Sequence, residues 1–157
     1  MKITDALLGE HAMLYALFTH IRHQISEERS VEQLHTAVDI LENQLWTHAQ
    51  MEEQHLFPSL EPHLGQMGPL AVMKAEHQDI DAFLSSAKTE DDPERLKSLI
   101  EDLITLSYSH FHKEEMVLFA MAKQFLSEDD QERLGGTWAN DRAVMINGTG
   151  CPSRAAG

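Results

Sequence analysis

Apolar residues recur along this chain at the three- and four-residue spacing of amphipathic helices. No segment alternates apolar and polar residues over a useful length, so the pattern that is typical of strands is missing. Long helices joined by short connections predict an all-α fold, an antiparallel up-down-up-down four-helix bundle. The four predicted helices cover about residues 5–25, 31–57, 69–88 and 94–125.

Residues that favour helix ends indicate where two of these helices begin or stop. Thr4 or Asp5 is expected to be the N-cap of the first helix. Pro58, Pro62 and Gly65 are expected to end the second helix, because proline interrupts the backbone hydrogen bonds and glycine suits the residue after the last turn.

A short fifth helix is predicted after the bundle. Ser127 and Asp130 resemble a capping box, and Gly135-Gly136 is expected to end this helix. The chain is therefore expected to consist of three parts. They are the bundle over residues 1–126, a short C-terminal helix within residues 127–147 that packs on or beside it, and a flexible tail over residues 148–157.

One sequence pattern, HxxxEExxLF, occurs twice and begins at His48 and at His110. A Glu-His pair precedes each copy, as Glu10-His11 before the first and Glu76-His77 before the second. The chain therefore resembles two copies of one helical hairpin. Each copy contributes one histidine followed by an HxxxE pair.

The spacing of the HxxxE pairs suggests a metal site. Residues four apart share one face of a helix, so His48 and Glu52 point the same way, as do His110 and Glu114. Both pairs fall on apolar stripes, where an ionised carboxylate is costly unless it is paired or bound to metal. One cation held by four histidines and a carboxylate would resolve the conflict, as would two cations bridged by both glutamates. A metal-free core of hydrogen-bonded polar groups is the alternative.

Other acidic residues and histidines surround these candidates in the sequence. Four glutamates are expected either in solvent or hydrogen-bonded to the ligands, namely Glu10, Glu53, Glu76 and Glu115. Five histidines fall off the apolar stripes and are expected at the surface, namely His20, His23, His35, His63 and His112.

Composition narrows the class of protein. A length of 157 residues fits one domain with a sizeable core. The formal charge of −14 disfavours binding to nucleic acid or to an anionic membrane. Cys151 is the single cysteine, so an intrachain disulfide is excluded and a cytoplasmic location is expected. No stretch has the roughly 20 apolar residues of a membrane span.

The repeated motifs resemble those of the hemerythrin family, in particular the bacterial hemerythrin-like HHE domains, over roughly residues 4–125. The resemblance implies an antiparallel four-helix bundle around two iron ions, bridged by an oxo or hydroxo group. The ligands it implies are His11, His48, His77 and His110 as terminal ligands, with Glu52 and Glu114 as bridging carboxylates.

The chain departs from the oxygen-carrying hemerythrins at two places. Met73 stands where those carriers have a fifth histidine, and the second HxxxE replaces their HxxxxD. A four-histidine site leaves more open coordination, which favours reactivity over simple storage of O2. His55 has Glu-x-x-His spacing from Glu52 and could supply a fifth nitrogen, or it could be an ordinary histidine near the bundle end. Tyr15 could line a ligand pocket together with Met73, or it could be a core residue.

The leading functional hypothesis is a non-heme di-iron protein that binds O2 or a related ligand such as NO or peroxide. An oxidase, or an enzyme that consumes peroxide or NO at the same centre, is the second hypothesis. The third is a sensor of oxygen or iron, which would need a separate protein partner for its output. The ligand types also permit zinc or manganese.

Overall fold

The computed structural model describes residues 1–27 and 29–145 of the chain, and within these ranges no residue lies in a strand. The predicted all-α fold is confirmed. No helix in this part of the chain is long and apolar enough to cross a membrane. The predicted tail over residues 148–157, with Cys151, lies outside the described residues. The elements are α1 (Ile3–Ser26), α2 (Val31–Met51), η1 (Glu52–Leu56), α3 (Phe57–Leu64), α4 (Pro69–Lys88), α5 (Pro93–Lys113), η2 (Glu114–Leu118), α6 (Phe119–Phe125) and α7 (Glu128–Asp141).

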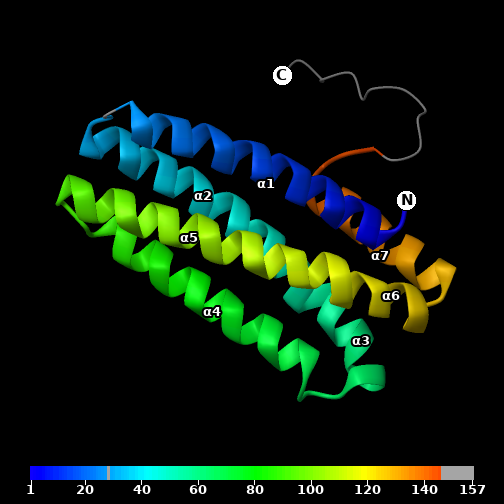
Figure 1. Ribbon diagram of the computed structural model, residues 1–157. Helices are drawn as coiled ribbons and strands as arrows, with labels where there is room; N and C mark the ends of the chain where they lie inside the picture. The colour runs from blue at the N-terminus through cyan, green and yellow to red at the C-terminus, as the bar shows by residue number, and fades with distance from the viewer. Residues whose placement is uncertain (28, 146–157) are drawn as a thin grey trace.

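Four long helices, α1, α2, α4 and α5, lie side by side along a common direction (Figure 1). Neighbours pack on one another in the cyclic order α1, α2, α4, α5, and α2 also contacts α5. The chain continues from α2 through η1 into α3, and from α5 through η2 into α6. The C-terminal helix α7 packs on α1 near the N-terminus of the chain (Figure 1).

In the bundle, the helix ends differ from the sequence prediction in two places. Lys2, not Thr4 or Asp5, is the N-cap of α1, and it makes no side-chain cap hydrogen bond. Neither Pro58 nor Pro62 ends the second helical segment. Pro58 lies in the first turn of α3, directly after the irregular turn η1. The segment ends at Gly65, whose φ of 71° lies in the left-handed region that favours glycine.

The fifth helix is longer than predicted, because it runs past Gly135-Gly136 to Asp141. Ser127 is its N-cap, as expected, and accepts a hydrogen bond from the Asp130 backbone N–H. Gly135 serves close packing instead of ending the helix. A Cβ at this position would lie 2.2 Å from the carbonyl oxygen of Met1, so only glycine lets α7 come this close to the start of the chain.

The apolar core is divided into two clusters, and buried histidines separate them along the four long helices. The first apolar cluster includes Leu14 and Phe18 of α1, and the second includes Ile3 and Leu7 of the same helix, with His11 between them. The order of the two clusters along the chain reverses from each long helix to the next, when η2 and α6 are counted with α5. The histidine-bearing layer is therefore enclosed by apolar side chains on both sides.

Candidate metal centre

Six side chains meet in the layer between the two apolar clusters, and they are the six that the resemblance implied. Each of the four long helices supplies one histidine, and η1 and η2 each supply a glutamate as their first residue. All six are buried, with at most 6% of their surface exposed. They are His11, His48, His77, His110, Glu52 and Glu114.

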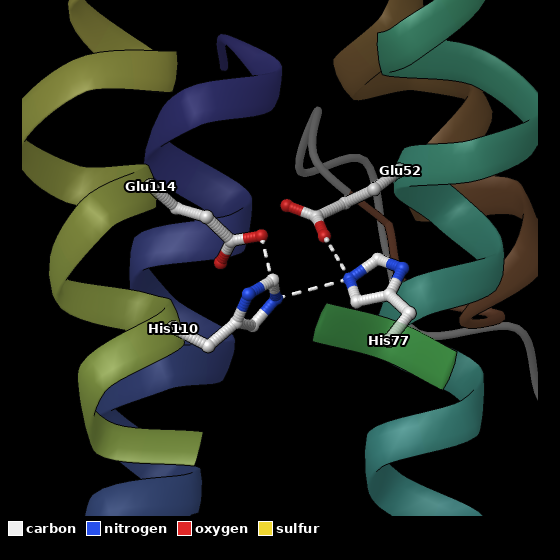
Figure 2. Close-up of side chains that lie close together, drawn as sticks. All are labelled: Glu52, His77, His110 and Glu114. Atoms are coloured by element: carbon white, nitrogen blue, oxygen red, sulfur yellow. Dashed lines mark hydrogen bonds and ion pairs between the residues drawn. The ribbon is translucent and has the colours of Figure 1, made fainter. Parts of the chain in front are cut away.

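The six residues form two overlapping groups, each able to surround a metal ion. His11, His48 and Glu114 form one group, called here position A. Position B consists of Glu52, His77, His110 and Glu114 (Figure 2). Within each group the donor atoms all lie within 4.8 Å of one another. Glu114 belongs to both groups, as a bridging carboxylate would.

The distances within the centre are short. In position A, the Nε2 atoms of His11 and His48 are 3.2 Å apart, and Oε2 of Glu114 lies 3.2 Å from Nε2 of His11. In position B, the Nε2 atoms of His77 and His110 are 3.0 Å apart. Oε1 of Glu114 lies 3.0 Å from Nε2 of His110 (Figure 2). Oε2 of Glu52 lies 3.4 Å from Nε2 of His77 and 3.7 Å from that of His48.

The glutamate oxygens provide a test of whether these residues fit a metal. Both carboxylate oxygens of Glu52 and both of Glu114 are buried without a hydrogen-bond partner. They lie near imidazole nitrogens, but the geometry is not that of hydrogen bonds. Buried carboxylates that lack such partners are costly, and cations shared with the facing nitrogens would remove the cost. Imidazole and carboxylate donors suit iron, zinc and manganese, so the residues fit a pair of such ions.

Each candidate histidine also contacts a second carboxylate through its other ring nitrogen. These contacts are the Nδ1 of His11 with Glu115 at 2.9 Å, of His48 with Glu10 at 2.8 Å, of His77 with Glu53 at 2.7 Å, and of His110 with Glu76 at 3.0 Å. All four glutamates that the sequence left open between solvent and the ligands are thus bonded to the ligands. The pairing also follows the repeat. The contact of His11 with Glu115 corresponds to that of His77 with Glu53, and the contact of His48 with Glu10 corresponds to that of His110 with Glu76.

These contacts orient the histidines for metal binding. An ionised carboxylate only accepts hydrogen bonds, so each Nδ1 must be the donor. In a neutral imidazole the lone pair is then on Nε2, which is the atom that faces the centre. A carboxylate behind a metal-ligating histidine is a common feature of metal sites, where it fixes the ring and strengthens the donor.

The electrostatics of the centre reflect its crowded charges. Burial alone would lower the pKa of His48, but the charge of Glu52 and the contact with Glu10 outweigh burial and raise this pKa to about 10. Burial acts to raise the pKa of Glu114, yet contacts from its neighbouring histidines hold this pKa well below its usual value. The pKa of Glu52 is raised by burial and then by the charge of Glu114. The centre therefore favours the ionised form of Glu114 and disfavours that of Glu52.

The two glutamates are placed by matching π-turns. The backbone N–H of Phe57 bonds to the carbonyl of Glu52, five residues earlier, and Phe119 bonds in the same way to Glu114. Such turns insert one extra residue into a helix and often occur at functional sites. Both copies of the HxxxEExxLF pattern contain one, so the widened turn is part of the repeat.

The π-turn also decides where His55 lies. A regular α-helix would place the position seven after His48 on the inner face, but the extra residue moves Leu56 there. Leu56 is fully buried, whereas the His55 side chain is 32% exposed, with its Nε2 3.8 Å from Asp141. His55 belongs to neither metal-binding group found among the described residues.

The other predicted site residues lie around the centre. The hydroxyl of Tyr15 donates to Oε1 of Glu115 at 2.9 Å, the same oxygen that accepts from His11. Burial and then Glu115 raise the pKa of Tyr15. Met73 is buried in the second apolar cluster, one helical turn before His77.

The histidines expected at the surface lie away from the centre. His35 is half-buried and contacts the carbonyl of Glu90 at 3.0 Å. The other four are exposed, namely His20, His23, His63 and His112.

Two contacts were missed by the sequence reasoning, and they come from the last turn of the C-terminal helix and the residue that caps it. Trp138 Nε1 and Arg142 Nε each donate to Oε1 of Glu10 at 2.7 Å. Oε2 of the same carboxylate accepts from His48. Nothing in the spacing of Trp138 and Arg142 pointed to the metal centre, because they pair with residues near the other end of the chain.

Comparison with known proteins agrees with the geometry. The sequence profile of the hemerythrin HHE cation binding domain matches residues 2–122, which include all six central residues. Helix α7 lies beyond this match. No curated protein and no solved structure matches the chain.

Proposed function

Because the chain belongs to the hemerythrin HHE cation-binding family, we propose that it holds two iron ions in the buried centre and binds O2, NO or peroxide there. His11, His48 and Glu114 hold one ion in position A, and the second ion occupies position B. Iron supplies open coordination positions and the ability to change oxidation state. The antiparallel four-helix bundle is part of this proposal, supported by the reversal of the two apolar clusters from helix to helix.

The observation that carries the proposal is the sharing of Glu114 between the two groups, with all four oxygens of the paired glutamates unsatisfied. A polar core without metal would be expected to pair these oxygens with N–H or O–H donors. A single ion would occupy one group and leave the donor atoms of the other group close together without a metal between them. Two ions that share Glu114 use all six residues.

The residues around the centre favour a small ligand. The ring of His11 stacks on Phe111, with ring centroids 4.2 Å apart, and Phe119 stacks beside it at 5.5 Å. Met73 fills the position of the fifth histidine of the oxygen carriers with an apolar side chain, so it adds no nitrogen donor to position B. The enclosure keeps bulk water away and leaves coordination free, which supports binding of a diatomic molecule or peroxide in preference to a larger substrate.

Metal analysis and an optical spectrum of the protein from iron-replete cells test the proposal. We expect two irons per chain and charge-transfer bands that change when O2, NO or peroxide is added. His110→Ala should lose iron, while His112→Ala should keep it, because His112 lies two residues away and is exposed. Protein without iron, or equal iron in the two variants, would show the proposal to be wrong.

The spectrum alone does not separate binding from catalysis. Steady consumption of peroxide or NO by the iron-loaded protein would favour the enzyme, and a stable adduct without turnover would favour the binding protein. A sensor would show a stable adduct and a ligand-dependent protein partner. The cytoplasmic location and the lack of nucleic-acid and membrane partners stay predictions.

A further inference from the structure

Helix α7 reaches the metal centre although it lies outside the matched domain. Glu10 joins the two, because Oε2 accepts from Nδ1 of His48 at 2.8 Å while Oε1 accepts from Trp138 and Arg142. Arg142 Nη2 also donates to the backbone carbonyl of Thr47, 2.9 Å away. The guanidinium thus ties Glu10 of α1 to α2 directly beside the ligand His48.

The partner of His48 is held more firmly than those of the other three histidines. Two donors, Trp138 and Arg142, fix one oxygen of Glu10, although Glu10 is about as buried as Glu76, with 17% of its side chain exposed against 13%. Its counterpart in the repeat is Glu76, which contacts a single lysine, Lys113, from the neighbouring helix α5. Glu115 accepts from Tyr15. The approximate twofold symmetry of the centre is therefore broken at Glu10.

The packing of α7 is suited to this role. Lys2 pairs with Glu128 at 2.7 Å at the start of the helix, and Gly135 permits the close approach to Met1. These contacts set the position of α7 along α1. Trp138, in the last turn of α7, and Arg142, the residue that caps the helix, then lie four residues apart and both face Glu10.

We propose that α7 is a positioning element for the metal centre. Trp138 and Arg142 fix the Glu10 carboxylate, Glu10 fixes the His48 ring, and position A thereby binds its metal more firmly than His11, His48 and Glu114 would alone. The inference rests on the proposed function, since it assumes that metal occupies the two positions. A helix outside the family domain then makes the two positions unequal in how firmly they bind metal.

The test uses the full chain loaded with ⁵⁷Fe(II), with Mössbauer spectra and the rate of iron loss to a chelator as readouts. In Trp138→Phe and Arg142→Gln, we expect one iron to be lost about tenfold faster, the lower end of the effect of removing a partner of a ligating histidine. The Mössbauer quadrupole doublet of the iron in position A should change, and the doublet of the iron in position B should stay the same. Arg142→Lys should lose this iron more slowly than Arg142→Gln does, because lysine keeps the positive charge.

Two control variants separate positioning from general loosening. Arg133→Gln removes a cation of the same helix whose side chain pairs with Asp130 alone within residues 1–27 and 29–145, and it should match the wild type. Lys113→Gln acts on Glu76, the counterpart of Glu10, and should change the other doublet. Far-UV circular dichroism and melting temperatures of all variants confirm that each is folded.

The outcomes distinguish the inference from the proposed function. If Trp138→Phe and Arg142→Gln hold two irons with loss rates and doublets like those of Arg133→Gln, the inference is wrong and the di-iron proposal stands. Equal changes in both irons would also overturn it, since α7 would then act on the whole bundle. A wild-type chain that takes up no iron would overturn the proposed function and the inference together.

Discussion

At the scale of single residues, the two central glutamates look equivalent in sequence but differ in the structure. Glu114 contacts three of the four histidines and belongs to both metal positions, whereas Glu52 belongs to position B alone. Glu114→Gln should therefore lower the occupancy of both positions, and Glu52→Gln should leave position A filled. We expect fewer than one metal per chain in the first variant and at least one in the second, measured by elemental analysis.

Both substitutions keep the shape of the side chain and remove a buried negative charge. Burial and the charge of Glu114 disfavour the ionised form of Glu52, so metal-free Glu52→Gln should be at least as stable as the metal-free wild type. The neighbouring histidines favour the ionised form of Glu114, so metal-free Glu114→Gln should be less stable, and melting temperatures measure both effects. Equal metal loss in Glu52→Gln and Glu114→Gln would contradict the unequal sharing. It would favour a centre in which both carboxylates bridge to the same extent.

At the scale of helices and turns, the sequence predicted which residues meet in the buried centre better than it predicted the elements that carry them. Regular α-helical spacing correctly places Glu52 on the same face as His48, because Glu52 is four positions after His48 and is the first residue of the π-turn. The same spacing fails at His55, which lies beyond the extra residue. The adjacent apolar pair Leu56-Phe57 was the available signal: both side chains are buried, which a wider turn allows.

The C-terminal helix shows a second limit of sequence reasoning. A pair of glycines is a common helix end, so Gly135-Gly136 was interpreted as one. The actual role of Gly135 depends on the backbone of Met1, which lies far away in the sequence. Local sequence patterns do not predict contacts between distant segments of the chain. The HxxxE repeat does predict the centre, because each copy places its histidine and glutamate on one face of its own helix.

The two glycines of α7 give a prediction about helix packing. Gly136→Ala should stabilise the protein by about 0.5–1 kcal/mol, since nothing lies within 4 Å of the added methyl and alanine favours a helix. Gly135→Ala should destabilise it by about 1–3 kcal/mol, because the methyl would collide with the Met1 carbonyl. Denaturant unfolding of both variants measures the difference. Equal stability would mean that α7 does not pack this closely on the start of the chain.

At the scale of the whole molecule, the metal centre links parts of the chain that the apolar clusters hold separately. Its donors come from all four long helices, and Glu10 extends the link to α7. The formal charge of −14 favours cations near the surface and opposes compaction by self-repulsion. Bound metal offsets part of that charge in the middle of the fold, so metal binding and global stability should be coupled.

Removal of the metal tests this coupling. A metal that binds only the folded chain stabilises it by about 2.7 kcal/mol at a free concentration one hundred times the dissociation constant. We expect the iron-loaded protein to unfold at a higher temperature than the chelator-treated protein, with stronger hydrogen-exchange protection in all four long helices and in α7. His110→Ala should show no such gain, and His112→Ala should show the full one. Protection confined to the turns that carry Glu52 and Glu114 would mean that the centre stabilises only its own surroundings, because a link through all four helices requires them to gain protection together.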